Sequence, residues 1–371
     1  MKTSSRGYNI AVVGASSLLG KELASVLEER KFPVAHLVTF EAGDASEEEP
    51  DLPILDLGPG SEAAVEDLEV KEADIDFAFL AARPKKLPAF LRPSRMGPSD
   101  AVRCIVIDVG ETLAEVPGLT VSAPFLGVVP LPGGASGDRR SRFVVSAHPA
   151  AIVISSLLLP LASRFEVKTG VAEIFIPASY SGPRGIEELQ KQTVNLLSFQ
   201  EVPSKVFGGQ LAFNLLPRFG RRGRSDRSGV SGLSGLEAAI RNQLRQLLGD
   251  RVPLPALRLV QMPVFYSLAL SLYIELAEAV PPEKIAAAVT EGAAGRVRLR
   301  RPSEPPPSPT AATGSGAILL DAILPDAGRP GGIWLWAAVD NLRLAAVNAV
   351  EIAERLQSKI SHRDTEAQRT H

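Results

Sequence analysis

The sequence contains few of the side chains on which most catalytic mechanisms depend. It has one cysteine, four histidines and only 5% aromatic residues in a chain of 371 residues. A single cysteine excludes an internal disulfide and a cysteine-based metal site. Two of the histidines, His362 and His371, lie in a polar C-terminal stretch (361–371) that we expect to be disordered. A Cys–His or Ser–His dyad therefore has few candidate members, and we expect no metal site.

Strong charge and long hydrophobic runs are also absent. The formal net charge is −2, so we expect neither nucleic acid nor a membrane surface as an electrostatic partner. No run reaches the roughly 18 apolar residues that a membrane helix needs. The first residues, Met1–Tyr8, are polar and lack a secretory hydrophobic region. These features predict a cytoplasmic protein, long enough for two domains.

The first part of the chain alternates strands with helical segments. Tyr8–Val13 is an apolar run of strand length, and Leu18–Arg30 places leucines and valine at helical spacing. Further apolar runs of strand length are 35–40, 75–80 and 102–108. This alternation predicts an α/β fold whose first domain, residues 1–147, is a doubly wound, Rossmann-type parallel sheet.

The second part, residues 148–335, predicts an α+β domain. Helices are expected at 149–163 and 185–199, and strands at 171–176, 257–266 and 269–279. Helices on one face of an antiparallel or mixed sheet would leave the other face as a surface for dimerisation. A last helix is expected over 341–359, with Asp340 as its N-cap.

Two segments are predicted to be mobile loops. Residues 218–234 are rich in Arg, Gly and Ser, and residues 301–316 are rich in Pro, Ser and Gly. The basic run in the first of them is either a solvated loop or a contact for an acidic partner, without the interleaved aromatic residues that nucleic-acid binding favours.

A glycine-bounded turn joins the first strand to the first helix. The turn consists of Gly14, Ala15, Ser16, Ser17, Leu18, Leu19 and Gly20. Gly14 would permit a tight turn, Gly20 would allow close packing of helix on strand, and the N–H groups of the helix N-terminus would face a pyrophosphate. Ser17 stands where a middle glycine is usual, so the alternatives are weak binding of NADP or NAD and a turn that binds nothing.

The chain resembles the aspartate-β-semialdehyde dehydrogenase family over nearly its whole length. Four stretches carry the resemblance in the family's order: NIAVVGASSLLGKELASVLEERKFPV at 9–34, QLAFNLLP at 210–217, VQMPVFY at 260–266 and WAAVDNLR at 336–343. The resemblance implies a Rossmann domain and an α+β dimerisation domain. It also implies a homodimer and a C-terminal helix (336–360) that returns to the first domain.

That family reacts through a cysteine thiolate, held at a helix N-terminus in an N-P-N-C-[ST]-T motif. The matching residues here are His148-Pro-Ala-Ala-Ile-Val153, so Ala151 stands at the nucleophile position. Alanine has no group that any environment could activate. The resemblance therefore implies a family member with an impaired catalytic site.

The other functional positions implied by the resemblance are altered in the same way. Leu268 stands at the position of the acid/base histidine, in a stretch SLALS that matches the family's G-H-S-E-A. Gln261 stands where an arginine binds the substrate carboxylate, and Ala178 stands at a glutamine. An arginine expected to meet phosphate is absent from Val109–Ala114. The VQMPVFY stretch fits the Usg-like branch better than the true enzymes, and Leu268 departs further still.

The remaining reactive side chains are interpreted as structural. Cys104 lies within an apolar strand and is expected to be a buried small hydrophobe. His148 is expected to cap a helix or lie at the surface, and His36 to be structural. Ser155 and Ser156 lie inside the helix, away from the N–H groups at its start, and are not expected to replace the nucleophile.

Three hypotheses remain open on the sequence alone. The first is a catalytically silent family member with a regulatory or interaction role. The second is an active NAD(P)-dependent oxidoreductase acting on an aldehyde or oxo group in aspartate-family amino-acid biosynthesis, which would need a titratable group in the cleft. The third is a protein that binds an unknown partner through its Arg-rich loop.

Overall fold

The structure is a computed structural model that describes residues 7–40, 75–82, 104–113, 118–128, 142–217, 232–293 and 295–367. The chain divides into two compact units. Unit 1 contains residues 1–124, 128–146 and 345–371, and unit 2 contains residues 125–127 and 147–344. Among the described residues, no helix is long and apolar enough to cross a membrane.

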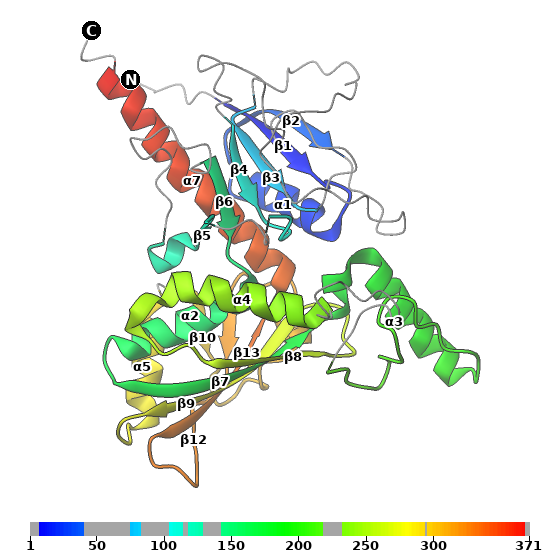
Figure 1. Ribbon diagram of the computed structural model, residues 1–371, viewed down its shortest axis with the longest axis vertical. Coiled ribbons are helices and arrows are strands. Elements are labelled where there is room, and N and C mark those ends of the chain that lie inside the picture. Colours follow the sequence, from blue (N-terminus) through cyan, green and yellow to red (C-terminus); the bar gives the residue numbers. More distant parts are fainter. Residues whose placement is uncertain are drawn as a thin grey trace. The chain divides into compact units, whose positions relative to one another are not determined.

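Unit 1 is built on a parallel sheet, which confirms the predicted Rossmann-type fold (Figure 1). Its strand order is β2-β1-β3-β4-β6-β5, and every neighbouring pair is parallel. The strands are β1 (Tyr8–Val13), β2 (Val34–Phe40), β3 (Phe77–Leu80), β4 (Ile105–Asp108), β5 (Thr120–Ser122) and β6 (Phe143–Ser146). All residues of β3, β4 and β6 are buried, as expected for central strands of a parallel sheet.

The core of unit 1 joins residues from both ends of the chain. Helix α1 (Leu18–Glu29) and helix α7 (Asn341–Ala367) pack on the same strands, which contribute side chains such as Ile10, Phe77 and Ile107. The α7 side chains in this core recur at helical spacing: Ala345, Ala346, Val347, Ala349, Val350, Ile352, Ala353 and Leu356. The return of the C-terminal helix to the first unit is therefore confirmed.

Helix α7 is longer than predicted, because it runs to Ala367 and includes part of the stretch expected to be a disordered tail. Its start is as predicted: the Asp340 carboxylate accepts hydrogen bonds from the N–H groups of Leu342 and Arg343, both at 3.0 Å. Within unit 1, Arg30 at the end of α1 forms a bidentate pair with Glu354 of α7, at 2.9 and 2.7 Å.

Unit 2 contains a second, mixed sheet. Its strand order is β10-β11-β13-β9-β7-β8, with β12 paired to β13. The strands are β7 (Val167–Ile176), β8 (Ala256–Gln261), β9 (Leu268–Leu276), β10 (Val297–Leu299), β11 (Ile318–Leu320), β12 (Leu324–Pro325) and β13 (Gly332–Val339). The pair β7–β8 is parallel, while β7–β9 and β9–β13 are antiparallel, as the sequence predicted for a mixed sheet.

Helices cover one face of this sheet. Helix α2 (Pro149–Ala162) packs on β7, α4 (Gly232–Leu248) packs on β8, and α5 (Pro282–Gly292) packs on α2. The strands alternate accordingly, because Leu257, Leu259 and Gln261 of β8 are buried while Ala256 and Arg258 are exposed. The two remaining helices are α3 (Gly182–Leu197) and the short α6 (Pro309–Ala312).

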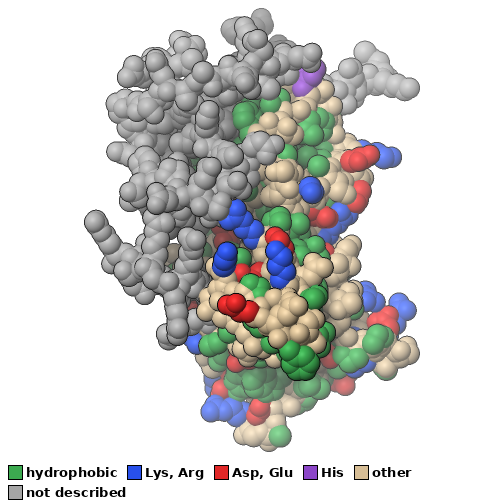
Figure 2. Space-filling model, turned by 90° about the vertical axis from the view of Figure 1, so that its right-hand side faces the viewer, with side chains coloured by type: hydrophobic (Ala, Val, Ile, Leu, Met, Phe, Trp, Pro, Cys, Tyr) green, Lys and Arg blue, Asp and Glu red, His purple; other side chains and the backbone are tan. Residues whose placement is uncertain are grey.

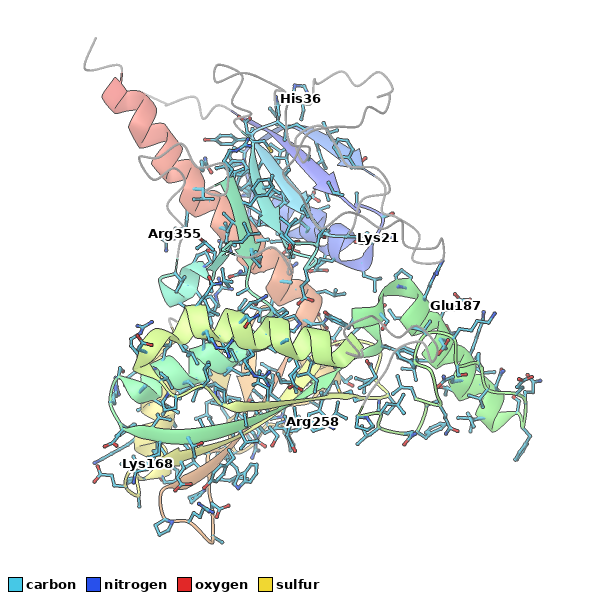
Figure 3. The ribbon with its side chains drawn as sticks, viewed as in Figure 1. Lys21, His36, Lys168, Glu187, Arg258 and Arg355 are labelled. Carbon is cyan, nitrogen blue, oxygen red and sulfur yellow. The ribbon has the colours of Figure 1, made fainter. Side chains whose placement is uncertain are left out.

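The opposite face of the sheet carries an exposed apolar row. The cross-strand register aligns Leu324, Trp334, Tyr273 and Val171 from β12 across β13 and β9 to β7. Leu324 is 59% exposed, Trp334 41% and Val171 42%. Arg258 lies on this exposed face too (Figure 3). Elsewhere, basic and acidic side chains lie interspersed over the described part of the surface shown in Figure 2.

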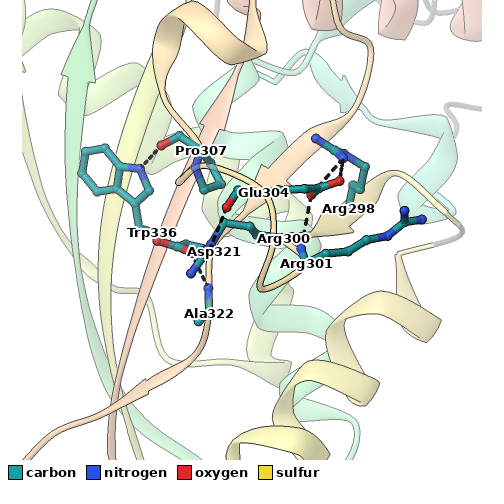
Figure 4. A network of polar contacts seen from close by, with 8 residues as sticks. All are labelled: Arg298, Arg300, Arg301, Glu304, Pro307, Asp321, Ala322 and Trp336. Atoms are coloured by element: carbon teal, nitrogen blue, oxygen red, sulfur yellow. Dashed lines mark hydrogen bonds and ion pairs between the residues drawn. The ribbon is translucent and has the colours of Figure 1, made fainter.

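The segment 301–316 is not the mobile loop that its composition suggested. Its backbone and side chains make defined polar contacts, several of which are drawn in Figure 4. The Trp336 indole N–H donates to the Pro307 carbonyl oxygen at 2.8 Å, and Arg300 pairs with Asp321 and donates to the Glu304 carbonyl at 2.9 Å. Of the other predicted loop, 218–234, residues 218–231 lie outside the described residues, and 232–234 begin helix α4.

Candidate functional site

Two of the candidate positions lie in one row at one end of the unit 2 sheet. Gln261, the last residue of β8, is the register partner of Ile176 in β7. Leu268, the first residue of β9, pairs with Val339 of β13, and the next pair along β9 joins Ala269 to Phe175. By strand alternation, the Gln261, Ile176, Leu268 and Val339 side chains lie on the face covered by helices, and Ala269 and Phe175 lie on the opposite face. The row Gln261–Ile176–Leu268–Val339 therefore crosses four strands without a charged side chain.

Ala151 lies in the first turn of α2, which covers this face. A short connection, 163–166, joins the end of α2 to the start of β7, so helix and strand run antiparallel and the start of α2 lies near the end of β7. A ring contact between His148 and Tyr180, with centroids 6.0 Å apart, fixes this proximity. Ala151 is fully buried. The structure thus brings Ala151, Gln261 and Leu268 to one end of the sheet.

His148 is the N-cap of α2, as one of the two predicted alternatives had it. Its Nδ1 accepts a hydrogen bond from the Ala150 N–H at 3.0 Å, and its own backbone N–H donates to Oε1 of Gln243 at 2.6 Å. The side chain is buried rather than at the surface. Burial lowers the pKa of His148 from 6.5 to about 3, because a charged imidazolium would lose its hydration.

Gln261 is fully buried, and its two amide atoms are in different situations. Its Nε2 donates to the Ile176 carbonyl oxygen at 2.9 Å, and that carbonyl also accepts from the Met262 N–H at 3.0 Å. Oε1 has no hydrogen-bond partner. The amide therefore turns its donor toward the sheet and leaves its acceptor unsatisfied.

Leu268 follows a residue with unusual backbone geometry that sequence reasoning missed. Ser267 has φ +68°, in the left-handed region that favours glycine. Its N–H donates to Oδ1 of Asn341 at 3.1 Å, and its hydroxyl lies 2.9 Å from that of Thr313. The one available signal was the glycine at this position in the family's G-H-S-E-A stretch. Leu268 itself is buried and aliphatic.

Ala178 begins a 3-10 turn, Ala178–Ser181, that follows β7. Its N–H donates to the Val264 carbonyl and the Ser179 N–H to the Phe265 carbonyl, both at 2.8 Å, so the chain before β9 runs beside this turn. The Ala178 side chain packs with Leu189, Phe207 and other apolar residues. The Ser179 Oγ is buried and has no hydrogen-bond partner.

Asp340 is the carboxylate nearest to this row along the chain, since it follows Val339. Its oxygens accept from three backbone N–H groups, those of Leu342 and Arg343 and that of Gly314 at 2.7 Å. A carboxylate engaged in this way serves as a helix cap and fastens the 301–316 segment. It is therefore a structural group in this arrangement.

The cysteine and the two helix serines take structural positions, whereas His36 is exposed. Cys104 is fully buried, and burial raises the pKa of its thiol to about 12, which suits a small hydrophobe and not a nucleophile. Ser156 donates to the Ile152 carbonyl within α2, at 2.6 Å, and Ser155 is buried in the same helix. His36 lies on β2 with an exposed side chain. The described residues contain no cluster that could hold a metal ion.

The backbone of the glycine turn in unit 1 is closely packed. Gly14 has φ +79°, and a Cβ there would meet Cβ of Ala82 at 2.6 Å. A Cβ at Gly20 would meet the carbonyl oxygen of Gly14 and, at 2.8 Å, Cα of Ala15. Both positions thus require glycine. Ser17 is the N-cap of α1, and its Oγ accepts the Gly20 N–H at 3.0 Å.

This turn lies at the point where the strand order reverses. From β1 the chain continues to β2 on one side, and β3 pairs with β1 on the other. Gly14 follows β1 and Ala82 follows β3, so both lie at the carboxyl ends of adjacent parallel strands. Open α/β sheets bind their ligands at this kind of position.

Fold and candidate site together define a two-unit α/β protein, with a Rossmann-like parallel sheet in one unit and a mixed sheet in the other. Residues 158–344 match the family model described as the semialdehyde dehydrogenase dimerisation domain. The chain belongs to the semialdehyde dehydrogenase family.

Relatives and solved structures agree over almost the full length. An aspartate-semialdehyde dehydrogenase of Rickettsia bellii is 28% identical over 94% of this chain and 97% of its own length. A USG-1 protein homolog of Pseudomonas aeruginosa is 27% identical over 95% and 98%. The structure of a probable aspartate-semialdehyde dehydrogenase from Pseudomonas aeruginosa matches with a TM-score of 0.72 and 25% identity, over 95% of this chain and 98% of that one.

Proposed function

We propose that this protein is a homodimeric member of its family that does not carry out thioester chemistry. One observation carries the proposal: Ala151, Ala178, Gln261 and Leu268 supply no nucleophile and no titratable group, although Ala151 occupies the start of a buried helix. The N–H groups and dipole of such a helix end would stabilise a thiolate. A methyl group gives them nothing to stabilise.

His148 does not replace the missing acid/base. Its Nδ1 is occupied by the Ala150 N–H. With the pKa of His148 near 3, the ring carries no extra proton at neutral pH that it could give to a substrate. The Asp340 carboxylate is held by its three backbone donors. The second hypothesis, an active oxidoreductase, therefore lacks a group for proton transfer among the described residues of this site.

We further propose weak binding of NADP or NAD at Gly14–Gly20. The left-handed Gly14 and the close packing at Gly20 fit the two glycine roles of a dinucleotide turn. Ser17 Oγ already accepts the Gly20 N–H at the start of α1, so the other main-chain N–H groups of the turn would meet the phosphate, and this supports weak binding. A bound nicotinamide would supply hydride chemistry. The chain's own part is to hold the pyrophosphate with main-chain N–H groups.

The direct test is calorimetric titration of the purified protein with NADP and with NAD, beside an assay for aspartate-β-semialdehyde dehydrogenase turnover. We expect binding without turnover. Turnover above the buffer rate would overturn the proposal of a silent enzyme and favour the active oxidoreductase, as the names of the relatives suggest. Absence of nucleotide binding would refute the second proposal and leave the first standing.

The nucleotide site is tested by Gly20→Ala. The added Cβ would collide with the Gly14 carbonyl and reshape the turn, so we expect NADP affinity to fall by at least about tenfold. The matched control is Lys21→Ala, since Lys21 is the neighbouring residue with its side chain exposed on α1 (Figure 3). Circular dichroism checks the fold of both variants. Equal affinities for Gly20→Ala and wild type would move the binding site elsewhere.

The homodimer is proposed to form through the exposed face of the unit 2 sheet. In the row Leu324–Trp334–Tyr273–Val171, two neighbouring aromatic side chains lie between two exposed aliphatic ones. A second copy of the same row can cover them. The segment 301–316 already covers the neighbouring row through its bond to Trp336. A twofold contact would therefore centre on Trp334.

A further inference from the structure

Helix α3 and the segment that follows it form an arm, residues 182–212, that projects from the unit 2 sheet (Figure 1). The buried Gln192 Oε1 accepts the N–H groups of Leu211 and Ala212, at 2.6 and 3.0 Å. The Glu188 carboxylate accepts those of Val206 and Phe207, at 2.7 and 3.1 Å. A small apolar core lies between helix and segment: Ala178, Leu189, Phe207, Leu211 and Ala212. The arm is therefore fixed by its own contacts.

The outer side of this arm is apolar. Val194 is 54% exposed and Leu197 70% exposed. They are three residues apart and so share one side of α3, whereas Leu189 and Gln192 are buried on the other side. Phe199, just past the end of the helix, is 99% exposed. Exposed apolar groups gathered in this way on a folded surface mark an interface with another protein.

Phe199 occupies a backbone position that favours glycine. It follows the C-cap Ser198 and has φ +56°. Its N–H donates to the Leu196 carbonyl oxygen at 3.4 Å, and the Gln200 N–H donates to the Asn195 carbonyl oxygen at 2.8 Å. This is the Schellman pattern of helix ends, in which the left-handed residue is most often glycine because a side chain there is strained. The exposed ring contributes nothing to the core of the arm, so its presence at a strained position indicates a role in recognition.

The position of the arm identifies its partner. The arm lies within residues 158–344, the part of the chain that matches the dimerisation-domain model. It continues from β7 through the 178–181 turn, and Val171 of β7 belongs to the row proposed as the twofold contact. The charges of Glu187 and Lys191 on α3 are neutralised in an ion pair with each other. The arm therefore offers an apolar surface that continues from the proposed interface.

We propose that the outer side of each α3 arm, Val194, Leu197 and Phe199, packs against unit 2 of a second copy of this chain, so that the two copies of the dimer hold each other by their arms. The length of α3, 16 residues or about 24 Å, lets its end extend beyond the sheet from which it starts. The inference rests on the proposed homodimer and adds a second contact to it, separate from the row centred on Trp334.

Phe199→Gly separates recognition from folding. Glycine suits the left-handed position, so the variant should keep the circular dichroism spectrum of the wild type. Its dimer dissociation constant, measured by sedimentation over a concentration series, should rise at least about tenfold, because an aromatic contact is lost at both symmetry-related places. Lys31→Gly is the matched control. Lys31 is exposed, has φ +53° and occupies the same position after α1 in unit 1, so this substitution should leave the dissociation constant unchanged.

Photocrosslinking from position 199 shows what the arm contacts. The one native cysteine, Cys104, is buried, so benzophenone maleimide will label Phe199→Cys at the new thiol. Irradiation of the full-length dimer should give a covalent species of twice the chain mass, with the crosslink in residues 147–344 of the other copy. Leu37→Cys, at an exposed leucine of unit 1, is the control and should give no such species.

The outcomes separate this inference from the homodimer itself. A dimeric wild type whose dissociation constant is unchanged by Phe199→Gly, or a labelled dimer that forms no crosslinked species, would overturn the role of the arm and leave the homodimer standing. Crosslinking of equal yield from positions 199 and 37 would also overturn it, because the contact would then be collisional. A monomeric wild type would refute both proposals.

Discussion

At the scale of single residues, His148 shows how a reactive side chain can be held in a structural role. Its imidazole accepts a hydrogen bond from the Ala150 N–H, contacts the Tyr180 ring and is buried. A neutral ring is required for this cap, because a protonated Nδ1 would be a donor facing another donor. Protonation of His148 is therefore linked to unfolding.

The consequence is a loss of stability at acidic pH. The pKa of His148 is near 3 in the folded chain and 6.5 when unperturbed, so between these values the unfolded state binds more protons and stability falls as pH falls. For this group alone the loss is about 2 kcal/mol at pH 5 relative to pH 8. Denaturant unfolding followed at several pH values measures it.

His148→Asn is the control for that measurement. An asparagine oxygen can still cap the Ala150 N–H but does not titrate, so its free energy of unfolding should depend less steeply on pH than that of the wild type between pH 5 and pH 7. Parallel curves for the two proteins would mean that the folded pKa of His148 is not depressed.

The residues at the site differ in how far the sequence revealed them. The four candidate positions could be located because they follow motifs along the chain. The hydrogen bond from the Ser267 N–H to Asn341 could not be predicted from the sequence. It joins residues 74 positions apart, and nothing in the local sequence of either residue indicates the other. The unpaired Gln261 oxygen was also out of reach, because it depends on which atom faces the Ile176 carbonyl.

At the scale of elements, apolar runs and helical spacing predicted β1–β4, β7–β9 and helices α1, α2, α3 and α7, whereas the short strands β5, β6 and β10–β12, the longer β13 and helices α4, α5 and α6 were not predicted. The first strand, Tyr8–Val13, was predicted with its observed limits because a glycine turn ends the apolar run. The segment 301–316 was predicted wrongly. Its Pro and Ser content indicates only that the segment is polar. The segment is ordered by hydrogen bonds and an ion pair to residues distant in sequence, such as Trp336 and Asp321.

Removal of one such contact should loosen this segment. Trp336→Phe keeps the ring but removes the N–H that bonds to Pro307, which costs about 1 kcal/mol. Trypsin cleavage between Arg300 and Arg301 should become several-fold faster, as followed by mass spectrometry. Trp334→Phe is the matched control, because the Trp334 indole donates instead to Asp326 at 2.8 Å. Equal cleavage rates for both variants would contradict this account of the segment.

At the scale of the whole molecule, the exposed row on the unit 2 sheet should determine the oligomeric state. Trp334→Glu places a charge at the centre of the proposed interface, where pairing two copies would bury like charges. We expect analytical ultracentrifugation to show a dimer for the wild type and a shift toward monomer for the variant. Leu37→Glu, at a 47% exposed leucine on β2 in unit 1, is the control and should stay dimeric. A dimeric Trp334→Glu protein would exclude this face.

The composition of the unit 1 core also has a consequence for biosynthesis. Its hydrophobic centre needs both the first strands and α7, which supplies eight of its buried side chains from residues 345–356. On the ribosome, unit 2 is therefore completed while the earlier-synthesised strands of unit 1 still lack their last helix. The N-terminal unit is therefore finished last. Until α7 emerges, the apolar sheet of unit 1 lacks this cover and is exposed to aggregation.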